Sequence, residues 1–497
     1  MFCDESDDIA RKATGVVTRR KLDVRTRAPN TEYMQYEFVD CTDEIMRGTP
    51  PSEQALGRSR SSSAPLDPAR PPSFTTDDLA MGLFYTHYIV KANSFADFLP
   101  SNDVATQAMH FSMKAIGLGG LAAFTRDQRL RKEARRQYSS AITSTNIALR
   151  SIETARLDST LLTVLLLGTF ESMASSSPRS LDYWINHING AASLLDLRSH
   201  KELANPHTAR LCIQVAAHVM VICLVQGIAL PPVILDQQNF FRQYVRTEDP
   251  VWRYQIHLAR LANFRAYVKQ GIIHDSTKIL VECNTLDSLF ALLIPDRFQP
   301  GWSFKAVDVD ADDTNDMFYS GQYHIYENEI AHQTWNGIRC MRILINEMIV
   351  DLLMEHPDLS SRAEAARSME TLKHMQVDIL SSVPQSLGIV RPAMHGEKEF
   401  KSADINDIQS RTTFPWVNFD NNDFNLGEMT ISSSLPWIRA WGGYTIIWPL
   451  YTAGSMRDAS DSSREWTIKA LRLYEKQTGA QQAAFFANIL EKKVRMR

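Results

Sequence analysis

One short segment limits most strongly what this chain can fold into. Residues 161–167 read LLTVLLL, and Asp158 stands shortly before them. A helix formed here carries apolar side chains on all of its faces, and such a helix is stable only when other elements cover it on every side. The segment therefore belongs in a core, and the chain must supply a domain large enough to enclose it.

The composition supplies enough apolar residues for such a core. Of the 497 residues, 44% are hydrophobic and 22% are charged, which is close to the average of globular proteins. These values exclude wholesale disorder and the collagen-like, mucin-like and disulfide-scaffold classes. The net charge of -4 also argues against a protein that coats nucleic acid with its whole surface.

From about residue 75 onward, the apolar residues recur at helical spacing. Ser177 and Pro178 are residue types that favour a helix N-cap and the first helical position. An apolar stripe follows them at Leu181, Trp184, Ile188, Ala191 and Leu195. Residues 335–353 and 464–493 are also strongly helical in pattern.

Strand-like alternation is scarce in the same part of the chain. Residues 307–316 form an acidic break, and residues 379–428 have the composition of loops. The fold class is therefore predicted as all-α, with a large helical domain over residues 76–495. If that domain divides into two lobes, we expect the boundary near residues 300–330.

The first 75 residues differ from the rest in composition. They hold seven prolines and the run RSRSSS at 58–63, and their apolar periodicity is poor. A segment that buries little apolar surface cannot offset the entropy lost on ordering. We predict that residues 1–75 are a mostly disordered arm.

A basic cluster lies within this arm. Residues 11–27 carry seven basic side chains and one acidic side chain, Asp23. The run Arg19, Arg20 and Lys21 is a candidate nuclear-import signal or phosphate contact. A solvated charge run without a specific role is the alternative interpretation.

The spacing of the cysteines argues against a structural metal site. The six cysteines are Cys3, Cys41, Cys212, Cys223, Cys283 and Cys340, and no two of them form a CxxC pair. A structural zinc site usually takes its ligands in closely spaced pairs. We therefore expect reduced, buried thiols and name no metal ligand.

One segment requires a decision between a membrane span and a buried helix. Residues 211–230 are nearly all apolar, but Gln214, His218 and Gln226 share one helical face. A membrane span seldom carries three polar groups on one face unless they line a path. We expect a buried helix of the large helical domain, with a membrane anchor as the alternative.

A search for catalytic and cofactor motifs is negative. The chain contains no HExxH, GxSxG or GxxxxGK[ST] sequence. Residues 117–120, GLGG, follow no strand, so close helix packing explains them better than dinucleotide binding. Asp308, Asp310 and Asp312 fail the calcium-loop pattern at its glycine and glutamate positions. We name no catalytic and no cofactor-binding residue.

Two further features have a structural and a functional interpretation. His187 lies at the edge of the apolar stripe, where a hydrogen-bonded core histidine is expected more often than a ligand. An aromatic cluster comprises Trp437, Trp441, Tyr444, Trp448 and Tyr451. Core packing is the expected role of this cluster, and the lining of a ligand pocket is the alternative.

Five segments, in this order, carry a resemblance to a known family. They are the leucine-rich helix at 158–171 ending in Phe-Glu, WINHINGAASLLDLR at 184–198, WNGIRCMRI at 335–343, SSVPQSLG at 381–388 and IWPLYTAG at 447–454. Together they resemble the fungal-specific transcription factors that carry a six-cysteine binuclear zinc cluster. The second segment matches the pattern H-x-x-G-A-x-x-L-L-x-x-R of that family.

The resemblance implies a helical regulatory domain in a nuclear transcription regulator. In the family this domain mediates partner contacts, while a separate module with two zinc ions and six thiolates reads DNA. That module needs six cysteines within about 30 residues, and the first 75 residues hold two. No zinc ligand is therefore carried over, and zinc is expected only if a cluster precedes this sequence.

The first residues resemble a different part of the same family. The segment 2–6, FCDES, is similar to the F-R-D-E-S stretch that follows the zinc cluster in relatives. This similarity predicts that the chain starts just after the DNA-reading module, either because the module is lost or because the assigned start codon lies too late.

We accordingly expect a nuclear transcription regulator that acts through protein contacts, with the transcription machinery or as a homodimer. A flexible basic arm meets phosphates without reading bases, so specific DNA binding by this chain is not expected. The alternative is an effector-binding helical protein that takes a small molecule. An enzyme is not expected, because no nucleophile and base stand out.

Overall fold

The computed structural model describes residues 75–85, 103–174, 178–244, 249–294, 301–309, 316–357, 362–387, 389–390 and 446–495. Within these ranges the chain is helical except for one pair of short strands. The predicted all-α class is confirmed. The predicted arm lies outside the described residues apart from Thr75, and the domain bounds and the lobe boundary stay predictions.

The helices of the N-terminal half are α2 (Thr76–Leu83), α3 (Val104–Thr125), α4 (Gln128–Ala148), α5 (Ile152–Ala155), α6 (Asp158–Ala174), α7 (Pro178–Leu195), α8 (His200–Leu203) and α9 (Pro206–Gln226). The middle of the chain forms α10 (Pro232–Phe241), α11 (Pro250–Lys269), α12 (Ser276–Ala291), α13 (Glu329–Glu355) and α14 (Arg362–Ser386). The last helices are α17 (Ile447–Ser455), α18 (Asp461–Thr478) and α19 (Gln481–Arg495).

Helix α6 is the centre of the N-terminal half, as its sequence requires. It begins at Asp158, and nearly all of its residues are buried. Helices α3, α4, α7, α9 and α19 all pack on it. The apolar surface on every face is thus covered by a different neighbour, which confirms the prediction of a core helix.

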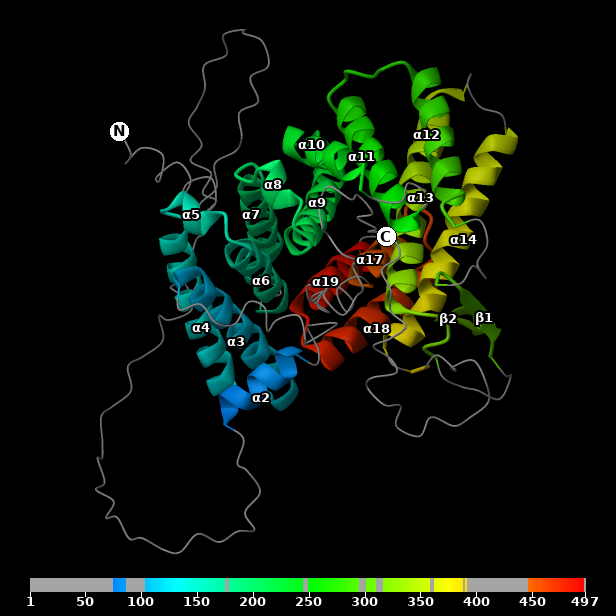
Figure 1. Ribbon diagram of the computed structural model, residues 1–497. Coiled ribbons are helices and arrows are strands. Elements are labelled where there is room, and N and C mark those ends of the chain that lie inside the picture. The colour runs from blue at the N-terminus through cyan, green and yellow to red at the C-terminus, as the bar shows by residue number, and fades with distance from the viewer. Residues whose placement is uncertain are drawn as a thin grey trace, which may run out of the picture.

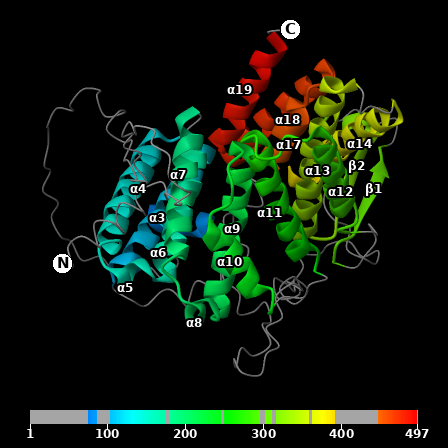
Figure 2. The ribbon, with the colours of Figure 1, turned by 90° about the horizontal axis from the view of Figure 1, so that it is seen from above.

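The C-terminal helices join the two ends of the molecule. Figures 1 and 2 show α17, α18 and α19 between the N-terminal helices on one side and α13 and α14 on the other. Helix α19 contacts α6 and α7, whereas α17 contacts α13 and α14. Segments far apart in the sequence therefore share one continuous hydrophobic core.

Two short strands stand between α12 and α13. Strand β1 (Phe304–Asp308) pairs antiparallel with β2 (Gln322–Tyr326), with Phe304 opposite Tyr326. The predicted acidic break at 307–316 is therefore partly a strand, since Val307 and Asp308 belong to β1. Helix α14 also includes residues 379–386, so the predicted loop-rich region at 379–428 begins with helix.

The predicted helix at 464–493 is two helices. Gly479 ends α18 with φ +74°, a left-handed conformation that glycine adopts without strain. A Cβ on this residue would lie 2.3 Å from the Cβ of Ala123 in α3. The break therefore allows the turn between α18 and α19 to rest against α3.

Helix α9 is buried along most of its length, as expected for residues 211–230. Cys212, Val215, Val219 and Met220 lie in the core, and α6, α7 and α11 pack around the helix. In the part of the chain that the structure describes, we find no helix with the length and apolar character of a membrane span.

Small residues let α2 approach α3 closely. A Cβ on Gly117 would lie 2.0 Å from the carbonyl oxygen of Ala80, whereas a Cβ on Gly119 would be 3.7 Å from the nearest atom, on Phe170. The interpretation of the GLGG segment as a helix-packing feature is confirmed for Gly117, which lies within α3.

This contrast gives a stability test with a matched control. We expect Gly117→Ala to lower the free energy of unfolding by about 1–3 kcal/mol, because the added methyl group overpacks the contact with α2. Gly119→Ala adds the same group in ordinary van der Waals space and should be neutral or stabilising by up to about 1 kcal/mol. Urea unfolding followed by circular dichroism measures both. Equal effects of the two substitutions would contradict the close α2–α3 contact.

Candidate functional site

Arg198, the last residue of the segment 184–198, is buried at a junction of three helices. Its Nη1 donates to the carbonyl oxygen of Leu194 at 3.1 Å. Its Nη2 lies 3.2 Å from both the carbonyl oxygen of Leu157 and Oδ1 of Asp158. Asp158 also accepts a 2.7 Å hydrogen bond from the Thr208 hydroxyl. The end of α7, the start of α6 and the first turns of α9 are thus held together.

A second buried cluster joins α4, α6 and α7. The Tyr138 hydroxyl donates to Oε1 of Glu171 and lies 3.3 Å from Nε2 of His187. Phe170 stacks on the Tyr138 ring with centroids 4.6 Å apart. Burial lowers the pKa of His187 to about 3, so this histidine is neutral. The prediction of a hydrogen-bonded core histidine is confirmed.

Arg339, in the segment 335–343, is the largest fully buried side chain among the described residues. Its Nη1 donates to the Tyr326 hydroxyl and to Oδ1 of Asn336, the latter at 3.0 Å. Its Nε lies 3.4 Å from Oδ2 of Asp378. The rings of Phe304 and Tyr326 lie 5.2 and 5.7 Å from the guanidinium carbon. Carboxylate and aromatic rings together compensate the buried positive charge.

The segment 381–388 closes this cluster from the opposite side. Asn336 donates to the Ser382 hydroxyl at 2.9 Å. The side-chain amide of Gln385 accepts from the backbone N–H of Tyr326 at 2.7 Å and donates to its carbonyl oxygen at 3.1 Å. Gln385 therefore pairs with β2 as a neighbouring strand would, and it fixes α14 against the edge of the sheet.

Arg342 extends the contacts of α13 to α12. Its guanidinium makes two hydrogen bonds with the carboxylate of Asp287, at 2.8 and 3.0 Å. Asn346 donates to the same carboxylate at 2.9 Å. Two parallel bonds of this kind fix the orientation of both side chains.

The segment 447–454 forms α17 and is held by polar contacts at its C-terminal end. Arg464 donates to the carbonyl oxygens of Gly454 and Met456, at 3.3 and 2.9 Å. Gln376 donates to the carbonyl oxygen of Ala453 at 2.8 Å. These donors satisfy carbonyl groups that have no partner within a helix end.

The described part of the aromatic cluster is half-buried and packs against the core. The Tyr451 ring stacks on Phe486 with centroids 4.4 Å apart, and Trp448 meets the same ring edge-on. Core packing is thus confirmed for Trp448 and Tyr451. Trp437, Trp441 and Tyr444 lie outside the described residues.

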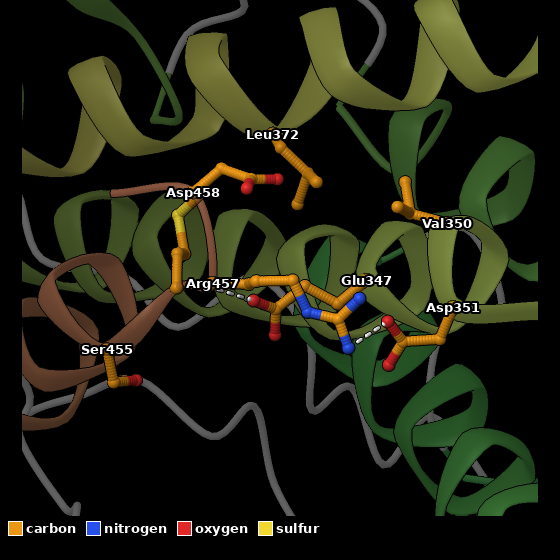
Figure 3. A pocket seen from close by; sticks show the side chains of 8 residues that line it. Glu347, Val350, Asp351, Leu372, Ser455, Arg457 and Asp458 are labelled. Carbon is orange, nitrogen blue, oxygen red and sulfur yellow. Dashed lines mark hydrogen bonds and ion pairs between the residues drawn. The ribbon is translucent and has the colours of Figure 1, made fainter. Parts of the chain in front are cut away.

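A small surface cavity lies where α13, α14 and the α17–α18 connection meet. Its volume is about 200 Å³, and it is lined by Glu347, Val350, Asp351, Leu372, Ser455, Met456, Arg457 and Asp458. Figure 3 shows the Arg457 side chain between the carboxylates of Glu347 and Asp351.

Internal contacts occupy the polar groups of this cavity. Arg457 forms an ion pair with Asp351, and its backbone N–H donates to Oε1 of Glu347 at 3.1 Å. Burial, with the nearby charge of Asp351, raises the pKa of Glu347. The arrangement stabilises the turn after α17, and it offers no pairing of a nucleophile with a base.

The remaining candidate residues either lie outside the described residues or are buried. Arg19, Arg20 and Lys21 lie outside the described residues, so their roles stay predictions, as do Asp310 and Asp312. Cys212, Cys223, Cys283 and Cys340 are free and buried as expected. Among the described residues, no group of three or more His, Cys, Asp and Glu side chains has the placement of a metal site.

The residues that contact the motif arginines were not predicted from the sequence. Asp378, Tyr326 and Asp287 contact motif arginines from distant segments. Each lies on an ordinary amphipathic helix or strand, and no local pattern marks it. The arginines of the motifs could have indicated that such partners exist, because a buried guanidinium requires a carboxylate or other acceptors nearby.

Comparison with known proteins finds one family match. Residues 86–226 match the family model described as the fungal specific transcription factor domain. The match covers less than half of the chain. The resemblance predicted from the sequence is confirmed over this range, which includes the Arg198 and His187 clusters. No curated protein and no solved structure matches the chain. The matched family is not a family of enzymes.

The burial of His187 predicts how stability depends on pH. The native histidine stays neutral down to a pKa of about 3, whereas in the unfolded chain it takes up a proton near pH 6.5. Below pH 6.5 the unfolded state therefore binds more protons, and the free energy of unfolding falls by up to about 1.4 kcal/mol per pH unit. Above pH 6.5 this contribution is constant.

The comparison of wild type with His187→Gln isolates this effect. Urea unfolding at several pH values between 8 and 4 should show a difference in stability that is constant above pH 7. Below pH 6 the difference should shift in favour of the variant, which lacks the titrating group. Parallel stability curves over the whole range would show that His187 accepts a proton in the folded protein.

Proposed function

We propose that this protein is a transcription regulator whose helical domain acts through protein contacts, as the family of zinc-cluster transcription factors does. The match of residues 86–226 to the fungal specific transcription factor domain is the observation that carries the proposal. The sequence itself holds no six-cysteine cluster. The proposed action therefore rests on the surface of the helical domain, with the transcription machinery or a second copy of the chain as partner.

The proposed location is the nucleus. A transcription factor domain acts there, and the run Arg19, Arg20 and Lys21 supplies basic residues of the type that import receptors bind. This assignment rests on the family and on the sequence.

The cavity at Glu347 and Arg457 does not favour the effector-binding alternative. Pockets for small organic ligands usually have volumes of about 300–1,000 Å³ and mostly apolar walls. The cavity at Glu347 and Arg457 is smaller, at about 200 Å³, and charged groups form much of its wall. The ion pair of Arg457 with Asp351 also occupies the groups that would recognise a ligand.

A tethering assay tests the proposed function. The full chain is fused to a DNA-binding module of known specificity, and transcription of a reporter with the matching operator is measured in a fungal host. We expect the fusion to change reporter output relative to the module alone. A fusion with Arg198→Ala lacks the buried hydrogen bonds of the guanidinium and should lose most of this effect. A nuclear, folded fusion that leaves the reporter at the level of the module alone would contradict the proposal.

A further inference from the structure

The start of α4 carries a concentrated positive charge. Residues 126–136 read RDQRLRKEARR, with six basic and two acidic side chains, which is a net charge of +4 (6 − 2). The exposed basic residues are Arg126, Arg129, Arg131, Lys132 and Arg136, and Arg135 is half-buried. The whole chain has a net charge of -4, so the rest of the protein carries -8 (-4 − 4) and this surface has the opposite sign.

The two acidic residues are engaged in local contacts of the helix. Asp127 is the N-cap of α4, and its side chain accepts from the backbone N–H of Arg129 at 2.7 Å. Glu133 accepts from Arg136 at 2.9 Å and from Gln137 at 2.7 Å. Most of the positive charge on this surface is therefore not neutralised by these two carboxylates.

This placement of charge is unfavourable for the isolated domain. The N-terminal end of a helix carries the positive end of the macrodipole and favours anions. Asp127 at the N-cap supplies one carboxylate there, but Arg129 and Arg131 add positive charge at the same end. Arg131 and Arg135, and Lys132 and Arg136, are like-charge pairs four residues apart, which destabilise a helix. Partial burial and the charge of Arg131 lower the pKa of Arg135. A polyanion bound along this surface would relieve all of these repulsions.

The position of α4 leaves the surface accessible. Both views place α4 at the outer edge of the molecule, beyond α3 (Figures 1 and 2). Its packing partners are α3 and α6, which cover the face that carries Ala134, Tyr138 and Ala141. Arg129, Lys132 and Arg136 lie on the opposite side of the helix. Arg131 is on the side of Ala134 but is exposed near the start of the helix. The helical part of the segment, residues 128–136, is about 14 Å long, which is enough to lie beside several phosphates of a DNA duplex.

The chemistry of the surface favours phosphates over an acidic protein. Specific protein interfaces contain apolar anchors at their centre, but between residues 126 and 143 α4 exposes no large apolar side chain. Five of the six cations are arginine, which binds phosphate oxygens through two parallel bonds.

We propose that the N-terminal half of α4 is a surface that binds the phosphate backbone of DNA without sequence preference. Arg129, Arg131 and Lys132 are its principal contacts. The inference stands apart from the proposed regulatory function, since it concerns where the folded domain touches nucleic acid and not how it affects transcription.

A binding titration with matched variants tests the surface. The full chain is titrated against a fluorescein-labelled 20-base-pair duplex of arbitrary sequence, and anisotropy is recorded at several salt concentrations between 50 and 200 mM. The test variant is Arg129→Gln, Arg131→Gln and Lys132→Gln. The control, with the same change of net charge, is Lys201→Gln, Arg242→Gln and Arg367→Gln, three exposed residues of other regions. Circular dichroism verifies that each variant is folded.

The α4 variant should bind the duplex about tenfold or more weakly than wild type. Its slope of log affinity against log salt should fall by about 2–3, because each lost phosphate contact removes nearly one released counterion. The control should change affinity by less than about twofold.

Three outcomes would overturn the proposal. The first is an α4 variant that keeps the affinity and salt slope of wild type. The second is a loss of binding in Arg19→Gln, Arg20→Gln and Lys21→Gln that α4 substitutions do not produce, which would assign the contact to the arm alone. The third is a poly-glutamate peptide that binds wild type as tightly as the duplex does, which would mark a surface for acidic proteins.

Discussion

A guanidinium group can be buried in a protein only where acceptors and opposite charge surround it, and this constraint shapes both halves of the molecule. An uncompensated buried charge costs far more free energy than a domain has to spare. Arg198 and Arg339 are both nearly inaccessible to solvent. Each is contacted by acceptors or a carboxylate from several helices or strands, so these elements must meet at one place and in one orientation.

The segments that carry the family resemblance therefore make contacts between helices inside the protein. Arg198 and His187 hold α7 to α6, α4 and α9. Asn336, Arg339 and Arg342 hold α13 to the sheet, α14 and α12. Helices α17–α19 then bridge the two groups. The arginines and the histidine of these segments therefore maintain the shape of the protein.

Much of this fold was predictable from the sequence, and for identifiable reasons. The all-apolar segment 161–167 required a core helix, Pro178 marked the start of α7, and His187 at the edge of an apolar stripe predicted a core histidine. The break at Gly479 and the strands β1 and β2 were missed. The break serves a contact with Ala123 in α3, and the strands are held by Gln385 in α14. Contacts between distant segments leave no local periodicity, so the partners Asp158, Asp378 and Asp287 could not be assigned to their arginines in advance.

The central claim is that the motif arginines stabilise the protein through specific, partly buried carboxylate partners. A double-mutant cycle with Asp158→Ala and Arg198→Ala, measured by urea unfolding, tests it most directly. The buried pair should show a coupling energy of about 1–3 kcal/mol, compared with about 0.3–0.5 kcal/mol for the exposed pair Glu133 and Arg136. A coupling for Asp158 and Arg198 that is no larger than that of the exposed pair would contradict the account.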